Sequence, residues 1–439
     1  LSTFTSFLKG PWKIAAQSVS STVALFVTFT IGVGCYQFIN TEGIGGTALF
    51  AGLPSWVFMS VMPIGFGLLA VRILWLSGDS WRLRLIPLVV GVALFMFCTY
   101  YFEAVESFVW PLLILLIIGT VAGAPLYVTI GGAALIMNWG WGGYFPEERV
   151  EIAINTQAQT LYSFIRNPLL VTLPLFTLAG YFLAQGDSSK RLIRLIQSVF
   201  GGVRGGAVIV TVVVCAFFTT FTGASGVTIL ALGGLLMPVL QSAGYSERSS
   251  IGMLTGAGSL GILFPPCLPL ILYAVVATNT QLVSLSLKDV FLGGAIPGTL
   301  LVLMTIGWGM WNQPKFEGER SPLDWNEIRK AFVGALGELL LPVLTLFALF
   351  SGYATPIEAA SVSAFYAFLL YLVDAHWVRS ANIRTELPQM VSECGLLVGG
   401  VLLILGVAMG LTDYLIFAMI PDQMVEWAQA TIESKYVFL

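Results

Sequence analysis

Two apolar stretches of this sequence contain glycine and hydroxyl side chains that a helix simply crossing a membrane would not need. The first reads FTGASGVTILALGGLLMP (221–238), and the second reads GAGSLGILFPPCLP (256–269). Backbone carbonyls of unwound segments coordinate cations such as Na⁺ inside membrane proteins. Glycine lets such a backbone come close to an ion or to another segment. These residue types therefore predict a cation site built from neutral oxygen atoms.

The predicted site has two halves, a hairpin tip and a helix break. Their backbones are Gly223-Ala224-Ser225-Gly226 and Gly258-Ser259-Leu260-Gly261. Side-chain oxygens are available from Thr219, Thr220, Thr222, Ser225, Thr228, Thr255 and Ser259. No Asp, Glu, Lys, Arg or His occurs between Gly205 and Ser246 or between Ser249 and Leu287. A proton relay in a membrane uses such groups, so their absence favours sodium over a transported proton.

Composition assigns the chain to a membrane. Of its 439 residues, 57% are hydrophobic and 10% are charged, whereas soluble domains average roughly 25% charged residues. Apolar runs of about 20 residues recur along the whole length, which predicts an all-α polytopic protein with the lipid bilayer as its surroundings. A net charge of −3 without a basic stripe argues against nucleic acid as a partner.

The apolar segments set the expected helices. They lie at about 14–39, 54–76, 84–102, 109–139, 168–184, 203–240, 249–280, 290–311, 332–352, 356–373 and 391–420.

Two of these segments are too long for one crossing and too broken for one helix. Residues 203–240 have charged flanks on both sides, and if both flanks are cytoplasmic the segment enters and returns as a re-entrant hairpin that turns near Thr222–Gly226. In 249–280, Pro265 and Pro266 remove backbone donors, so a crossing helix is expected to unwind there.

A weak internal repeat accompanies these breaks. A hinge near Gly123-Ala124-Pro125 divides 109–139, and GAPLYVTIGGAALIM (123–137) has a counterpart in GYATPIEAASVSAFYAF (352–368). Each copy is followed about 50 residues later by another apolar helix, at 174–184 and 401–411. Flanking charges give the two copies opposite orientations. Inverted repeats with broken helices are a hallmark of secondary transporters.

Other interpretations compete with the cation site. Small residues also let membrane helices pack closely, without any ligand. Gly223-Ala224-Ser225-Gly226 fits the G-x-S-G of rhomboid intramembrane proteases, but a serine nucleophile needs a base and His376 is the only histidine. We therefore expect no enzyme. The five cysteines are scattered singly, which predicts packing residues and no transition-metal site.

The charged residues near the apolar segments have plain structural explanations. Glu358 is expected to cap the helix that starts after Pro356. Four basic residues between the apolar segment 168–184 and the start of the hairpin segment are expected to face water or lipid headgroups. They are Lys190, Arg191, Arg194 and Arg204.

At this point the sequence resembles the large membrane subunit of the tripartite ATP-independent periplasmic (TRAP) transporters. The residues that carry the resemblance are SGVTILALGGLLMPVLQSAGYSERSSIGMLTGAGSLGILFPPCLPLILYAV (225–276), PLFTLAGYFLAQG (174–186) and GYATPIEAASVSAFYAFLL (352–370). The usual GxxTPTEAA departs at Ile357, which stands where the family has threonine, so no hydroxyl is available there.

The resemblance implies a division into three parts. Residues 1–83 resemble the end of the small subunit with two membrane helices, residues 84–108 form a connector helix, and residues 109–439 form a large subunit truncated before its second hairpin. The chain ends are therefore not expected to be natural termini.

The resemblance also implies a function and a site. Such transporters take up organic acids with a sodium gradient across the bacterial inner membrane, a periplasmic solute-binding protein delivers the solute, and an elevator motion carries it. Na⁺ is then the coupling ion and no organic cofactor is needed. The implied sodium site comprises Gly223, Ser225, Gly258, Ser259, Gly261 and Pro265. The implied substrate contacts are Thr220, Thr222, Ser225 and Pro266, with Thr355, Pro356 and Glu358 as further family positions. A sodium-coupled carboxylate carrier without a binding protein is the alternative.

Overall fold

The computed structural model describes most of the chain, including every residue of the predicted site. The described ranges are 10–43, 48–50, 53–78, 80–100, 102–140, 149–279, 286–313, 324–379 and 383–432. The two chain ends lie outside these ranges.

The prediction of an all-α polytopic membrane protein is confirmed. Seven described helices are long and apolar enough to cross a membrane, or up to nine if each of two bent helix pairs forms one span. The strands among the described residues are one short antiparallel pair, β1 (Ala48–Phe50) and β2 (Leu53–Pro54). The helices therefore carry the fold.

The chain packs as two compact units. Unit 1 comprises Leu1–Arg166 and Gly400–Leu439, and unit 2 comprises Asn167–Gly399. This division follows packing and does not test the three parts expected from the sequence. The helix α19 (Ile383–Phe417) contributes residues to both units.

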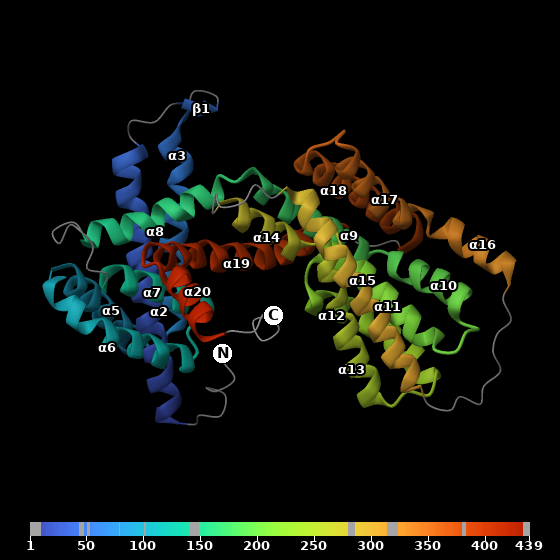
Figure 1. Cartoon of the computed structure of the whole chain (residues 1–439), viewed down its shortest axis with the longest axis horizontal. Coiled ribbons are helices and arrows are strands. Elements are labelled where there is room, and N and C mark those ends of the chain that lie inside the picture. Colours follow the sequence, from blue (N-terminus) through green and yellow to red (C-terminus); the bar gives the residue numbers. More distant parts are fainter. Residues whose placement is uncertain are drawn as a thin grey trace. The chain divides into compact units, whose positions relative to one another are not determined.

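Unit 1 contains the short strand pair, which Figure 1 shows at one end of the unit's helices. Its remaining elements are α2 (Pro11–Phe38), η1 (Ile39–Gly43), α3 (Ser55–Met59), α4 (Val61–Leu76), α5 (Trp81–Tyr100), α6 (Phe102–Val121), α7 (Leu126–Gly140), α8 (Arg149–Ile165) and α20 (Ile420–Thr431).

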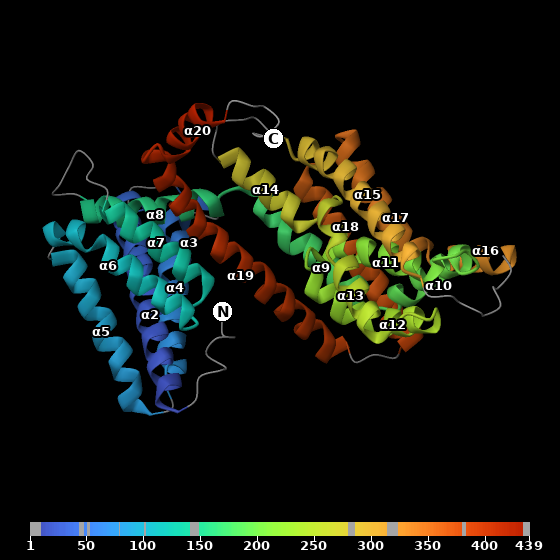
Figure 2. The same cartoon turned by 60° about the horizontal axis from the view of Figure 1, so that its bottom comes forward.

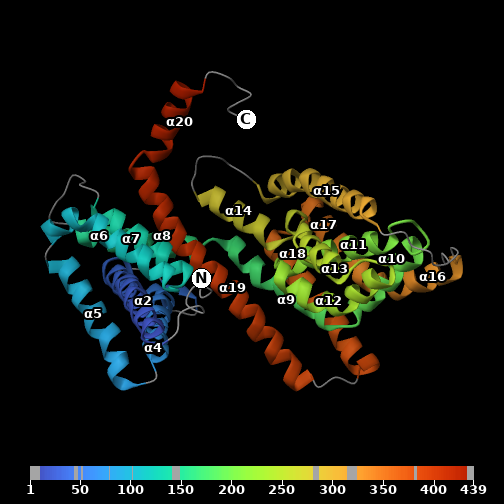
Figure 3. The same ribbon diagram turned by 90° about the horizontal axis from the view of Figure 1, so that it is seen from below.

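The centre of unit 1 is α2, which contacts α4, α5, α6, α7 and α8. Figure 3 shows α2 and α4 side by side. The core of this unit includes Val27, Ile31 and Trp139, all at least 98% buried. A 28-residue helix such as α2 is about 42 Å long, enough to cross the bilayer while its sides pack on neighbours.

Unit 2 contains the predicted hairpin and the predicted break. Its elements are η3 (Pro168–Val171), α9 (Thr172–Gln185), α10 (Ser188–Phe200), α11 (Gly206–Thr222), α12 (Ser225–Ser242), α13 (Glu247–Ala257), η4 (Leu260–Leu263), α14 (Leu268–Asn279), α15 (Leu287–Trp311), α16 (Trp325–Gly334), α17 (Leu336–Ser351), α18 (Pro356–Val373) and η5 (Asp374–Arg379).

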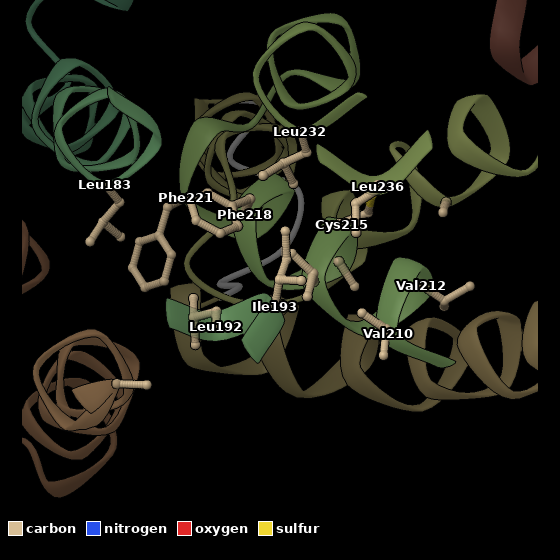
Figure 4. Packing of buried hydrophobic residues seen from close by; sticks show 14 of the residues in the cluster. Leu183, Leu192, Ile193, Val210, Val212, Cys215, Phe218, Phe221, Leu232 and Leu236 are labelled. Atoms are coloured by element: carbon tan, nitrogen blue, oxygen red, sulfur yellow. The ribbon is translucent and has the colours of Figure 1, made fainter. Parts of the chain in front are cut away.

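The core of unit 2 forms around α9, α11 and α18, which Figure 2 shows side by side. Close up, Phe218 and Phe221 of α11 lie among buried leucines of α9 and α12 (Figure 4). Leu232 and Leu236 on α12 are four residues apart, so both point from one face of that helix into this core. The two arms of the hairpin are thus held together by apolar packing.

Both copies of the weak repeat have the same local structure. In the first, a turn at 122–125 separates α6 from α7, and Gly123 has φ of 104°. In the second, a turn separates α17 from α18, and Gly352 has φ of 77°. Positive φ is a conformation that glycine adopts without strain. The predicted hinge near Gly123 is therefore confirmed, while the inverted orientation of the copies stays a prediction.

The prediction that Arg191 faces water or headgroups is wrong. Its guanidinium donates to Asp374 Oδ1 at 2.8 Å and Oδ2 at 2.7 Å, and to Glu338 Oε1 from Nε at 2.7 Å. Glu338 and Asp374 are both at least 96% buried. The neighbouring Lys190 and Arg194 do have mostly exposed side chains, as expected.

Two buried carboxylates explain why Arg191 turns inward. Burial acts to lower the pKa of the Arg191 guanidinium, but hydrogen bonds to Asp374 and the charge of Glu338 outweigh burial and raise that pKa above its ordinary value. A buried ion cluster persists when hydrogen bonds satisfy its members. The triad joins α10, α17 and the start of η5.

Candidate functional site

The hairpin tip has the structure that the sequence predicts. The helix α11 ends at Thr222, Gly223 has φ of 64°, Ala224 is extended, and α12 begins at Ser225. Any Cβ on Gly223 would also collide with Leu268, the first residue of α14. Only glycine therefore fits this turn. The structure shows the helix–turn–helix, and the side of the membrane at which it opens stays a prediction.

The predicted break is also present. The helix α13 ends at Ala257, a single 3₁₀ turn follows at Leu260–Leu263, and α14 begins at Leu268 after two prolines. The helices on either side of the break are bent by 42°. The Pro265–Pro266 peptide bond is cis. Pro266 is buried and Pro265 is partly buried.

Tip and break lie directly against each other. A Cβ on Gly261 would lie 2.6 Å from both the Thr219 Cβ and the Thr220 amide nitrogen, and a Cβ on Gly258 would lie 2.6 Å from the Ile229 side chain. Real Cβ contacts are longer, so glycine is needed wherever the two segments touch. The structure thus brings the two halves of the predicted site together.

A network of threonine hydroxyls bridges the two halves. Thr219 Oγ1 donates to the Gly258 carbonyl at 2.8 Å, and its oxygen lies within hydrogen-bond distance of Thr228 Oγ1, at 3.0 Å. The hydroxyls of Thr222 and Thr228 are 2.9 Å apart. Thr220 donates to the Ala216 carbonyl and approaches the Gly261 carbonyl at 3.4 Å. The buried face of the tip is therefore lined by neutral oxygen atoms and held by hydrogen bonds.

The other predicted hydroxyls are placed differently. Ser225 is partly buried, and its hydroxyl has no hydrogen-bond partner among the described residues. Ser259 is partly buried and donates to the Gly256 carbonyl at 2.8 Å. Thr255 is exposed and donates within its own helix to Ile251, so it adds no oxygen to the buried network.

Four helix ends converge at this place. Carbonyl ends of α11 and α13 meet amino ends of α12 and α14, since the tip packs on Leu268 and the break packs on Thr219. Carbonyl ends carry partial negative charge and amino ends carry partial positive charge. The arrangement therefore suits a cation at one position and an anionic group at another, without any charged side chain.

The third predicted group forms a helix cap of its own. Thr355 and Glu358 form a capping box, in which the Glu358 amide donates to Thr355 Oγ1 at 3.3 Å and the Thr355 amide donates to Glu358 Oε2 at 2.7 Å. Pro356 occupies the first turn. The expectation that Glu358 caps α18 is confirmed.

Sequence reasoning missed the contribution of α9. A Cβ on Gly180 would lie 2.6 Å from the Thr222 amide nitrogen, so α9 touches the hairpin tip. One turn away, Thr177 is fully buried and its hydroxyl has no partner among the described residues. The small residues Ala179 and Gly180 are the signal that could have indicated a close contact, but nothing in the sequence identifies the segment on the other side.

The protease interpretation lacks its base. The Ser225 hydroxyl makes no hydrogen bond to a histidine or carboxylate among the described residues, and His376 is an exposed residue of η5. A nucleophilic serine requires such a neighbour. The tip geometry is therefore that of a packed, oxygen-lined turn.

A hairpin and a broken helix that pack tip to break lie within an α-helical membrane protein, and such broken helices are typical of secondary transporters. A sequence profile described as "Tripartite ATP-independent periplasmic transporter, DctM component" matches residues 109–439. The chain belongs to this family, whose members are permeases of the bacterial inner membrane rather than enzymes.

Individual relatives agree with the profile. The chain is 34% identical over 267 residues to the C4-dicarboxylate TRAP transporter large permease protein DctM of Vibrio cholerae, covering 59% of this chain and 55% of the relative. It is 29% identical over 326 residues to the isethionate TRAP transporter permease protein DctMQ of Oleidesulfovibrio alaskensis. That match covers 72% of this chain and 49% of the relative. It is 28% identical over 340 residues to the C4-dicarboxylate TRAP transporter large permease protein DctM of Rhodobacter capsulatus, and that match covers 74% of this chain and 73% of the relative. The chain thus spans about half the length of the first two.

Proposed function

We propose that this chain is the membrane part of a sodium-coupled importer of an organic acid, which a periplasmic solute-binding protein delivers. The observation that carries the proposal is the contact between the hairpin tip and the helix break in unit 2. Neutral oxygens and four helix ends meet there, and such places bind coupling ions and anionic substrates in secondary transporters.

The absence of acidic and basic side chains from both broken segments supports sodium as the coupling ion. Between Gly205 and Ser246, and between Ser249 and Leu287, the sequence has no Asp, Glu, Lys, Arg or His, the groups that proton relays in membranes use. Carbonyl and hydroxyl oxygens can replace the hydration shell of Na⁺ without titrating. Ser225, with its unpartnered hydroxyl at the tip, is the side chain that we propose as a ligand.

Relatives bear on the substrate and the partner. The three relatives are named for C4-dicarboxylates and isethionate, all small organic acids, and for TRAP transport. The proposal for this chain is an acid of the same class. Unit 2 contains the whole of the tip and the break, so it is the part that we expect to move in an elevator cycle.

Reconstitution tests the proposal. The full-length transporter in liposomes, with its solute-binding protein outside, should accumulate a labelled organic acid under an inward sodium gradient with pH clamped. Equal uptake under a proton gradient alone, with no Na⁺ present, would contradict sodium coupling. Uptake that is the same with and without the binding protein would favour the carrier that needs no delivery protein.

A further inference from the structure

Asp413 is a charged residue near the carboxyl end of α19, in a long apolar run of that helix. The candidate span in α19 has the highest mean hydropathy of the seven, 2.5. Between Glu393 and Asp422 the sequence contains no other charged residue. Ionisable groups within membrane helices are costly, and they face partners or water and mark ion and substrate paths. Asp413 therefore needs a partner.

In unit 1, α19 approaches α8 closely enough to supply one. Gly406 lies against Leu161, since a Cβ on Gly406 would lie 2.6 Å from Leu161 Cδ2. One turn later, the side-chain amide of Gln157 occupies the space where a Cβ of Gly410 would stand. The two glycines, four residues apart, let side chains of α8 lie directly against the backbone of α19.

Two oxygen-bearing side chains of α8 point at this contact. Thr160 Oγ1 donates to Asp413 Oδ2 at 2.5 Å, and Gln157 Nε2 donates to the Val407 carbonyl at 3.4 Å. Gln157 is 99% buried, and its Oε1 atom has no hydrogen-bond partner among the described residues. Residues three apart share a helix face, so Gln157 and Thr160 lie over Gly410 and Asp413.

The charge in this contact is unbalanced. Among the described residues, no Lys, Arg or His forms an ion pair with Asp413. A buried amide oxygen without a donor is unfavourable in an apolar environment, and the half-buried carboxylate beside it has no counter-charge. A small cation would satisfy both the amide oxygen and the carboxylate, because carboxylate, amide and hydroxyl oxygens can coordinate one ion together.

We propose that Asp413, Gln157 Oε1 and Thr160 Oγ1 form a monovalent-cation site in unit 1 that takes Na⁺. It shares no residue with the hairpin and break of unit 2. The proposal rests on the proposed sodium coupling for its physiological ion, and it adds a second place where that ion binds. A role in helix packing alone is the competing explanation.

Equilibrium binding of ²²Na⁺ to the purified full-length protein in detergent tests the site. Asp413→Asn keeps the shape of the side chain and should lose one class of bound Na⁺. Gln157→Leu should weaken the same class by about 10- to 100-fold. Asp422→Asn is the matched control, since Asp422 is an exposed carboxylate at the start of α20, and it should bind as wild type does.

Ser225→Ala separates this site from the one in unit 2. It should weaken a different class of bound Na⁺ and leave the Asp413 class in place. If Asp413→Asn and Gln157→Leu both bind Na⁺ as wild type does while Ser225→Ala is impaired, the unit 1 site is refuted and the proposed function stands. Wild-type protein that binds no Na⁺ would refute both. If Asp413→Asn elutes as an aggregate, Gln157→Leu and Thr160→Val decide the question in its place.

Discussion

Gly180 of α9 lies against the backbone of Thr222 at the hairpin tip, where a Cβ on Gly180 would stand 2.6 Å from the Thr222 amide nitrogen and 2.8 Å from its Cα. No side chain lies between the two segments at this point. The position of the tip is thus set by direct contact with α9, and any added atom must displace one of them.

Gly180→Ala should destabilise the protein by about 1–3 kcal/mol, the usual cost of adding atoms to a packed interior. Unfolding in mixed micelles of rising SDS content measures the change. Gly233→Ala is the control, because a Cβ on Gly233 of α12 meets nothing within 4 Å. An equal effect of the two substitutions would mean that helix propensity, and not the tip contact, decides the result.

Thr219→Val should cost about 1–3 kcal/mol, because it leaves the Gly258 carbonyl without its hydroxyl donor and removes one of the partners of the Thr228 hydroxyl. Thr211→Val is matched to it, as Thr211 is equally buried on α11 but donates only to Ala207 in its own helix. Thr211→Val should cost less than about 1 kcal/mol. Thermal unfolding in detergent compares the melting temperatures of the two variants. Identical values would show that the bridge made by Thr219 does not stabilise the protein.

Ser225→Ala should raise the sodium concentration for half-maximal uptake. Removal of one neutral ligand is expected to cost about 1–3 kcal/mol, or roughly 5- to 150-fold in affinity. Ser225→Thr keeps the oxygen and should be milder. Uptake into liposomes at varied Na⁺ is the measurement, and Ser242→Ala, on the exposed far end of α12, is the control. If Ser225→Ala leaves the sodium dependence of uptake unchanged, Ser225 is a packing residue and not a sodium ligand.

Arg191→Met should destabilise unit 2 by about 3–5 kcal/mol, because two buried carboxylates lose their counter-charge. Arg194→Gln on the same helix removes an exposed pair with Glu327 and should cost at most about 1 kcal/mol. Combining Arg191→Met with Glu338→Gln and Asp374→Asn should recover part of the loss. Resistance to SDS unfolding reports all three, and a wild-type value for Arg191→Met would show that the triad is not stabilising.

The hairpin and the break could be predicted because their causes are local. Gly223 at a turn, two adjacent prolines and a segment too long for one crossing are all visible in the sequence without knowledge of any neighbour. The capping box at Thr355 and Glu358 is local in the same sense, since its two members are three residues apart.

The partners of Arg191, Gly180 and Asp413 could not be predicted in this way. Arg191 and Glu338 are 147 residues apart, and Thr160 and Asp413 are 253 apart. Amphipathic helix α10 has the same pattern whether its basic face meets water or buried acids. The outcome depends on how α17 and η5 pack against α10, and the sequence of α10 alone does not determine that packing.

The Arg191 triad also constrains the order in which the protein can be built. Arg191 leaves the ribosome 147 residues before Glu338 and 183 before Asp374. Until both acids have been synthesised, the Arg191 guanidinium lacks part of its counter-charge. The contacts of α10 with α17 and with the start of η5 can therefore reach their final form only after residue 374 has been made.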